Sequence, residues 1–232
     1  MENKRVLLKL SGEGLKNGKE KIIDFDYLKQ VCLDIKKLQD LDYEIGIVIG
    51  GGNIWRGRDN TYIDSELSDK IGIMSTTMNS LILSATFKAI DSKAIALNAF
   101  DIEEIVSKAT SDTIAKSLED KNIIIFGGGT GKVGCSTDTA AALRAIDMKA
   151  DMLIKVTKVD GVYDSDPKVN ENANKYDKVS FDEVIEKELN VMDIPAVKLC
   201  KDNNIPIFVM NINRLKDISS MLENFDEGTL IS

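Results

Sequence analysis

The stretch Glu44 to Asn53, EIGIVIGGGN, joins a short apolar run to three consecutive glycines. Its first six residues, Glu44 to Ile49, predict a buried β-strand, because β-branched side chains pack well on a covered, pleated surface. The glycines that follow predict a tight turn in which the backbone can approach a ligand closely. A strand that ends in a glycine turn is typical of the strand-to-helix connections of α/β proteins.

This arrangement recurs along the 232-residue chain. Short apolar runs alternate with helical patterns, and the strands are almost wholly apolar, which favours a mostly parallel sheet covered by helices on both faces. The sequence therefore predicts an α/β fold, an αβα sandwich, that forms a single domain over residues 1–232. The expected strands are Arg5 to Leu10, Glu44 to Ile49, Lys93 to Leu97, Asn122 to Phe126, Met152 to Val156 and Pro206 to Met210.

Helical patterns fill the intervals between the expected strands. One helix should begin behind Asp24, a good N-cap residue, and a longer one should include Leu67 to Leu81. The Ala-rich segment Thr137 to Lys149 predicts a third, and a capping box at Ser180 predicts a helix that extends through Leu189. The polar stretch Ser165 to Lys178 is expected to be a long surface loop or the division between two lobes of one domain.

Composition excludes several classes of function. The chain has no histidine, which removes Ser-His-Asp catalysis, Cys-His catalysis and His-ligated zinc. Its formal charge of −8 disfavours a nucleic-acid or anionic-membrane surface. Cys32, Cys135 and Cys200 are far apart, so they predict neither a disulfide framework nor a zinc site and fit a reducing cytoplasm. No apolar run reaches about 18 residues, so we expect neither a signal peptide nor a membrane span.

Four of the expected strands end in turns of similar chemistry. In a parallel sheet these turns lie at one edge, where glycine turns that lead into helices present backbone N–H groups to anions. Glycine is common in such turns for structural reasons alone, but four together favour a phosphate-binding edge. The turns are Lys9-Leu10-Ser11-Gly12, Gly50 to Asn53, Gly127 to Gly131 and Thr157 to Gly161.

The third turn, Gly127 to Gly131, partly matches two familiar phosphate-binding motifs. The Walker motif is not satisfied around Lys132. Phe126 stands where the motif requires its first glycine, and Val133 stands where it requires Ser or Thr. Residues Gly129 to Gly134 do satisfy G-x-G-x-x-G, but the next expected strand lacks the acidic residue that would hold a ribose hydroxyl. A dinucleotide-binding oxidoreductase therefore remains an alternative.

With these motifs in place, the chain resembles the bacterial uridylate kinases of the amino-acid-kinase superfamily. Members of that family use ATP to phosphorylate UMP to UDP, in pyrimidine biosynthesis, on an αβα sandwich without a Walker loop. The resemblance runs from end to end. The matching segments are Lys4 to Gly12 (KRVLLKLSG), Val48 to Gly57 (VIGGGNIWRG), Thr130 to Asp138, Ile154 to Pro167 (IKVTKVDGVYDSDP), Val191 to Asp193 (VMD) and Gly228 to Ile231.

The resemblance also implies roles for individual residues. Lys9 and Arg56 would contact the phosphates of ATP, and Asp138 would orient the active-site lysine, which makes these three the implied catalytic residues. Implied ATP-binding residues are Lys9, Leu10, Ser11, Gly12, Gly52, Arg56, Thr157, Tyr163 and Asp166. Implied UMP-binding residues are Gly51, Asp69, Thr130, Gly131, Lys132, Val133, Gly134, Cys135, Ser136 and Thr137.

This chemistry is compatible with a chain that has no histidine. The nucleophile is already an anionic phosphate oxygen, so no general base is needed, and catalysis reduces to in-line alignment and neutralisation of charge. Lys9, Arg56 and backbone N–H groups would supply that neutralisation. Mg²⁺ would be held mainly by nucleotide phosphates, so no protein-ligand metal site is expected.

The residues alone are also compatible with purely structural roles. Lys9 and Arg56 could simply reach solvent, Asp69 and Asp138 could serve only as helix caps, and Tyr163 could be a packed loop aromatic.

The loop Gly131 to Asp138 departs from the family pattern, because it lacks an asparagine and two aromatic residues. This departure bears on nucleobase selectivity. Lys132 could contact phosphate or face water, and Cys135 is interpreted as a small packing residue rather than a reactive thiol.

The family resemblance further implies a homohexamer, with GTP activation or UTP inhibition in many members. Two other hypotheses are kept beside the kinase and the oxidoreductase: a carbamate or amino-acid acceptor, and a non-catalytic uridine-nucleotide sensor.

Overall fold

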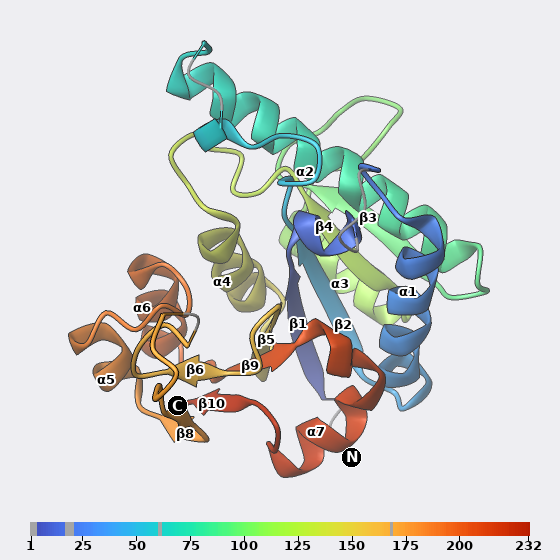
Figure 1. Cartoon of the computed structure of the whole chain (residues 1–232). Coiled ribbons are helices and arrows are strands. Elements are labelled where there is room, and N and C mark those ends of the chain that lie inside the picture. Colours follow the sequence, from blue (N-terminus) through green and yellow to red (C-terminus); the bar gives the residue numbers. More distant parts are fainter. Residues whose placement is uncertain (1–3, 17–20, 60–61, 168) are drawn as a thin grey trace.

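An eight-stranded sheet runs through the molecule in the order β3-β4-β2-β1-β5-β9-β10-β8 (Figure 1). The computed structural model describes residues 4–16, 21–59, 62–167 and 169–232. Six neighbouring strands of the sheet are parallel, and β10 pairs antiparallel with β9. The strands are β1 (Arg5–Leu10), β2 (Glu44–Ile49), β3 (Ala94–Asn98), β4 (Ile123–Gly127), β5 (Met152–Thr157), β8 (Lys178–Val179), β9 (Ile207–Asn211) and β10 (Thr229–Ile231).

All six strands expected from the sequence are present, with ends within one residue of those predicted. The short strands β8 and β10 were not predicted, because two or three residues carry too little pattern. A separate hairpin joins β6 (Val162–Tyr163) to β7 (Lys175–Tyr176). The prediction of a loop from Ser165 to Lys178 is therefore wrong at its C-terminal end, because Lys175, Tyr176 and Lys178 lie in strands.

Helices cover both faces of the sheet, which confirms the predicted αβα sandwich (Figure 1). On one face lie α1 (Phe25–Asp40), α2 (Ser65–Lys88), the 3₁₀ helix η3 (Ile212–Asp217) and α7 (Ile218–Asn224). On the other lie α3 (Ser111–Glu119), α4 (Thr137–Asp147), α5 (Phe181–Glu186) and α6 (Ile194–Asp202). Two further 3₁₀ helices, η1 (Gly12–Lys16) and η2 (Gly57–Asp59), follow β1 and β2.

Local capping explains where two of these helices begin. The Asp24 carboxylate accepts from the Tyr27 N–H at 3.4 Å, as expected of an N-cap residue. Ser180 likewise accepts from the Glu183 N–H at 3.1 Å. The helix behind Ser180 ends at Glu186 rather than at the predicted Leu189. The Glu183 side chain pairs with Lys187 at 2.6 Å instead of turning back to complete the capping box.

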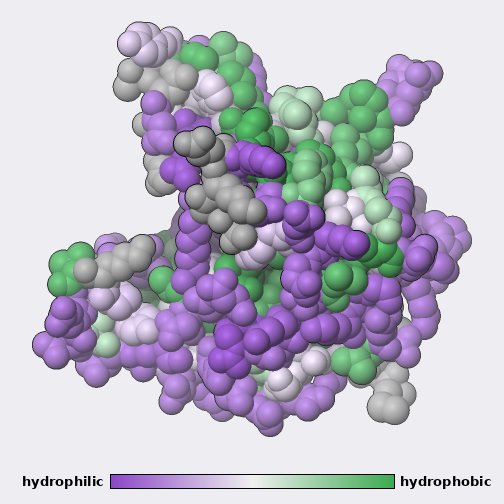
Figure 2. Space-filling view, turned by 45° about the vertical axis from the view of Figure 1, so that its right-hand side comes forward, coloured by the Kyte–Doolittle hydropathy of each residue, from purple (hydrophilic) through white to green (hydrophobic). Residues whose placement is uncertain are grey.

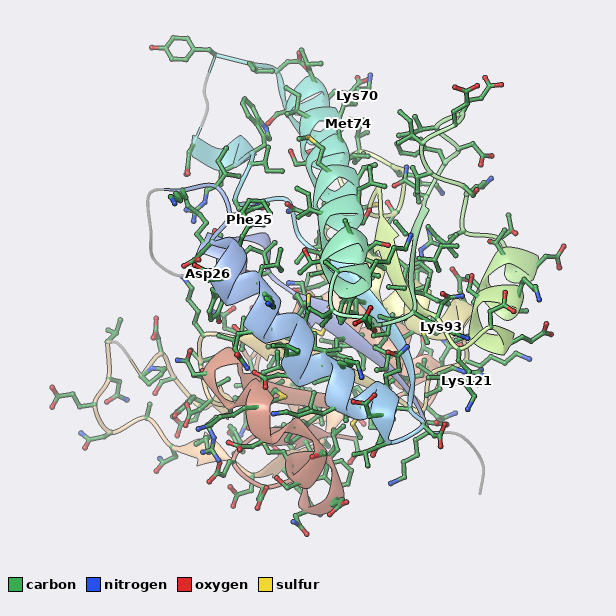
Figure 3. All side chains as sticks on the ribbon, turned by 90° about the vertical axis from the view of Figure 1, so that its right-hand side faces the viewer. Phe25, Asp26, Lys70, Met74, Lys93 and Lys121 are labelled. Atoms are coloured by element: carbon green, nitrogen blue, oxygen red, sulfur yellow. The ribbon has the colours of Figure 1, made fainter. Side chains whose placement is uncertain are left out.

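The helix α2 has an unusual distribution of polarity. Its buried positions include Ser75, Thr76, Thr77, Asn79, Ser80 and Ser84. Its exposed positions include Leu67, Met74 and Met78. Figure 3 shows Lys70 and Met74 on the outward side of α2, and Figure 2 shows hydrophobic surface in the upper half of the molecule, where this helix lies. Small polar side chains therefore pack much of α2 against the sheet, together with Leu83 and Phe87 near its C-terminal end, whereas several apolar side chains in its N-terminal part face outward.

Within the described ranges, no helix is both long enough and apolar enough to cross a lipid bilayer.

Candidate active site

The four glycine turns lie at one edge of the sheet, because the strands that precede them are parallel neighbours in the order β4-β2-β1-β5. The turns behind β1 and β2 touch: a Cβ atom added to Gly12 would overlap the Gly50 carbonyl oxygen. The turn behind β4 needs positive φ angles, with Gly128 at 74° and Gly131 at 76°. Glycine is thus required here by close approach and by backbone conformation.

Two lysines and one aspartate form a buried charge cluster at this edge. The Lys9 Nζ lies 2.7 Å from the Asp138 Oδ1, and the Lys155 Nζ lies 3.0 Å from the Asp138 Oδ2. Lys9 and Lys155 are register partners on β1 and β5, and Asp138 is in the first turn of α4. Lys155 also donates to the Val191 carbonyl. The side chains of Lys9, Lys155 and Asp138 are only 11%, 14% and 15% exposed.

Burial and charge act against each other in this cluster. Burial alone would raise the pKa of Asp138, but the ammonium groups of Lys9 and Lys155 hold that pKa below its usual range. Burial lowers the pKa of Lys155, and the Asp138 carboxylate opposes that shift. With both lysines protonated and Asp138 ionised, the cluster carries one net positive charge, which attracts an anion to the glycine turns.

Lys155 was missed by the sequence analysis, although a signal for it existed. It interrupts the apolar strand β5 with a charged residue, just as Lys9 interrupts β1. Because β1 and β5 are neighbours, the two interruptions fall at the same level of the sheet. The sequence did not reveal which strands are neighbours.

Arg56 lies beside the turns behind β1 and β2. Its Nη2 is 2.6 Å from the Glu13 Oε1, and its Nε donates to the Gly52 carbonyl at 3.3 Å. Asp59 lies farther away, at 3.8 Å from Nη1. The Arg56 side chain is 37% exposed, so its guanidinium is at the border between the turns and solvent.

A cavity of about 160 Å³ opens between the N-terminal half of α2 and the loop behind β4. The sequence analysis missed several of its lining residues, among them Trp55, Ser68, Gly72 and Thr76. Predicted site residues that line it are Gly51, Gly52, Asp69, Thr130, Lys132, Cys135 and Thr137.

The other predicted residues of the loop from Thr130 to Thr137 do not line this cavity: they are Gly131, Val133, Gly134 and Ser136. The Asp69 Oδ2 accepts from the Gly134 N–H at 2.6 Å, which ties α2 to the loop. Ser136 caps α4, because its hydroxyl accepts from the N–H groups of Asp138 and Thr139, each at 3.0 Å. Gly131 and Val133 are exposed in the same loop.

A second cavity, of about 310 Å³, is lined by the segment that follows β5 and by residues 187–190. Tyr163 and Asp166 line it together with Gly161, Lys187 and Leu189. The Tyr163 hydroxyl donates to the Asp160 carboxylate at 2.8 Å, and this hydrogen bond raises the pKa of Tyr163. Thr157, the last residue of β5, does not line this cavity.

Comparison with known proteins now identifies the fold. Residues 4–211 match the family described as the amino acid kinase family. The chain belongs to the amino acid kinase family. Among curated members, it is 38% identical to uridylate kinase of Rickettsia conorii over 233 residues, covering 100% of this chain and 96% of that protein. It is 39% identical to uridylate kinase of Rickettsia typhi, with the same coverage.

Solved structures of the amino acid kinase family agree. The chain superposes on UMP kinase from Ureaplasma parvum with a TM-score of 0.94 and 36% identity, covering 100% of both chains. It superposes on UMP kinase from Bacillus anthracis with a TM-score of 0.93 and 32% identity, covering 99% of this chain and 96% of that one.

Proposed function

We propose that this protein transfers the γ-phosphoryl group of ATP directly to UMP, giving UDP and ADP. One observation carries the proposal: the Lys9–Asp138–Lys155 cluster and a cavity of about 160 Å³ border the same glycine turns at one sheet edge. Full-length likeness to uridylate kinases and UMP kinases supports UMP as the acceptor. The dinucleotide alternative loses its support, because the family that matches residues 4–211 is a kinase family.

The chain's own residues account for the chemistry of this transfer. A UMP phosphate oxygen is already anionic, so the reaction needs alignment and charge neutralisation rather than a general base. Lys9 and Lys155 would face the transferring phosphoryl group and stabilise charge on its equatorial oxygens. Asp138 would hold both ammonium groups in place and offset their mutual repulsion.

We assign the two nucleotides to the two sides of this cluster. ATP phosphates would bind the turn Lys9 to Gly12 with Gly52 and Arg56, and the ATP base and sugar would lie near Thr157, Tyr163 and Asp166. Arg56 would exchange the Glu13 carboxylate for phosphate oxygens, which offer the same bidentate acceptor geometry.

UMP would occupy the smaller cavity. Gly51 would allow close approach of its phosphate, and the Asp69 carboxylate would accept from its ribose hydroxyls. The base would contact the loop from Thr130 to Thr137.

Mg²⁺ fits this assignment as an ion held by ATP phosphates and water. Asp138, the carboxylate at the centre of the cluster, is already engaged by two lysines. Among the residues that the structure describes, no group of three Asp, Glu, Cys or His side chains could hold a metal. When bound, the ion would lower the repulsion between the ATP phosphates and UMP.

We further infer that the chain acts as one domain over residues 1–232 and assembles as a homohexamer. A single sheet that contains residues from Arg5 to Ile231 supports the first inference. The exposed Leu67, Met74 and Met78 on α2 support an assembly contact. GTP and UTP are proposed as effectors from the family resemblance. A cytoplasmic location is supported by three free cysteines, of which Cys32 and Cys200 are buried.

A coupled assay of ADP formation tests this function. We expect ADP with ATP, Mg²⁺ and UMP, with lower rates for CMP and dUMP. Carbamate and amino-acid acceptors should give no ADP. An absence of ADP with every nucleoside monophosphate would refute the proposal, and tight NADH binding measured by fluorescence would revive the oxidoreductase.

A further inference from the structure

Two buried asparagines lie where α2 meets the glycine turns. Asn79, on α2, is 0% exposed, and Asn53, the last residue of the triple-glycine turn, is 6% exposed. The mechanism proposed above uses neither side chain. Burying two amides costs free energy unless their donors and acceptors are paired, so the bonds that they make are informative.

The two amides bind each other and the backbone around them. The Asn79 Nδ2 donates to the Asn53 Oδ1 at 2.7 Å and to the Gly50 carbonyl at 2.8 Å. The Asn53 Nδ2 donates to the Asn79 Oδ1 at 3.1 Å and to the Ile22 carbonyl at 3.2 Å. The Asn79 side chain therefore satisfies a carbonyl of the very turn that forms the phosphate-binding edge.

The pair also touches the turn assigned to ATP. A Cβ atom added to Gly12 would lie 2.5 Å from the Asn53 Oδ1, so Gly12 packs directly on this amide. The donor turn behind β1, the turn behind β2 and α2 thus meet at one pair of side chains.

The same helix carries the acceptor side. Asp69 lies ten residues before Asn79 on α2, which places it about 15 Å away along the helix axis. Between them, Gly51 packs against Ser75, where a Cβ atom on Gly51 would lie 2.8 Å from the Ser75 Cβ. The helix α2 therefore connects the carboxylate assigned to the acceptor with the turns assigned to the donor phosphates.

We propose that the Asn53–Asn79 amide pair positions the two nucleotides for transfer, by fixing the acceptor helix α2 against the donor turns. This inference rests on the proposed function. Direct phosphoryl transfer is sensitive to such a link, because an error of about 1 Å in alignment can cost about 10²-fold in rate. Binding of each nucleotide alone depends on contacts within its own half of the site and is much less sensitive.

The test compares steady-state constants of Asn79→Ala with those of the wild-type protein at 25 °C. We expect kcat to fall about 10- to 100-fold, with the KM for ATP and the KM for UMP each within about 3-fold. The double variant Asn53→Ala/Asn79→Ala should lose little more than Asn79→Ala, because the two side chains act as one unit.

Two control variants separate alignment from stability. Leu38→Ala, which removes a fully buried side chain near the C-terminal end of α1, should lower the melting temperature by several degrees and leave kcat within about 2-fold. Ser84→Ala removes another buried polar group from α2, five residues beyond Asn79, and should also leave kcat within about 2-fold.

The isosteric variant Asn79→Asp provides a second measurement. When ionised, it keeps the acceptor for the Asn53 amide but has no donor for the Gly50 carbonyl, so kcat should fall as in Asn79→Ala.

Either an unchanged kcat in a folded variant, or a raised KM with kcat intact, would overturn the inference. Failure of both Asn79 variants to fold would overturn it too, since the pair would then serve folding alone. If the wild-type protein forms no ADP from UMP, the proposed function itself fails.

Discussion

The donor and acceptor sides of the sheet edge are built in different ways. On the donor side, Lys9, Lys155 and Asp138 are held by two neighbouring strands and a helix, and their side chains are at most 15% exposed. On the acceptor side, residues 131–136 form an exposed loop that is tied to α2 by the hydrogen bond from Gly134 to Asp69. The fold therefore preforms the charge that we propose acts on phosphate, whereas the proposed recognition of the acceptor depends on an exposed loop.

The largest expected effect is on the donor side. Lys9→Ala should lower kcat by about 10²- to 10³-fold, because it removes a buried cation that we propose contacts the transferring phosphoryl group. The Kd of UMP, measured by calorimetry, should change little, since UMP binds on the other side. The exposed strand lysine variant Lys178→Ala serves as the control. Unchanged turnover would remove Lys9 from the mechanism, and a turnover already absent in the wild-type protein would favour the sensor hypothesis.

A second prediction concerns pH. In Asp138→Asn, kcat should fall about 10-fold or more, and its alkaline limb should move to lower pH. The Asp138 carboxylate holds the pKa of Lys155 up against burial, which lowers it, so loss of that charge lets the pKa of Lys155 fall further. Rate profiles from pH 6 to about pH 10 measure the shift. An alkaline limb at the wild-type position would mean that Lys155 does not act as a cation in the reaction.

A smaller effect is expected on the acceptor side, where α2 meets the loop. Asp69→Asn should raise the KM for UMP about 10-fold with kcat within about 3-fold, because a hydrogen bond to a charged acceptor is worth about 1.5–3 kcal/mol. The KM for ATP should stay constant. A matched control is Asp64→Asn, which changes the N-cap of the same helix. Equal changes in both KM values would contradict the division of the site into two sides.

The smallest effect is expected in the exposed loop. Lys132→Ala should raise the KM for UMP about 2- to 3-fold at low salt and less at high salt, because an exposed cation contributes little and is screened. The measurement is the KM for UMP at two ionic strengths. A loss of more than 10-fold would show instead that Lys132 is a primary phosphate contact.

The comparison also shows what the sequence could predict. The strand of Lys9 and the strand of Lys155 were both predicted from their apolar residues, because buried parallel strands have a strong signal. Their adjacency was not predicted, so the Lys155 partnership with Asp138 was missed. Strand order depends on packing between distant segments, which local pattern does not record.

The partners of the side chains within the site could not be predicted from the sequence, for a similar reason. The sequence placed Arg56 near the glycine turns but did not indicate that Glu13 would engage it. Likewise, the helical spacing of Leu67, Met74 and Met78 predicted α2 but not that these residues would face outward. Their exposure follows from the small polar residues that pack against the turns, among them Asn79.

The central claim is that the edge holds both nucleotides at once and passes phosphate directly between them. The stereochemical course at the γ-phosphorus tests it most directly, using ATP made chiral there with oxygen isotopes and UMP as the acceptor. A single in-line transfer predicts inversion of configuration in the β-phosphate of UDP. Retention would require two successive transfers through a phosphorylated side chain and would contradict the account.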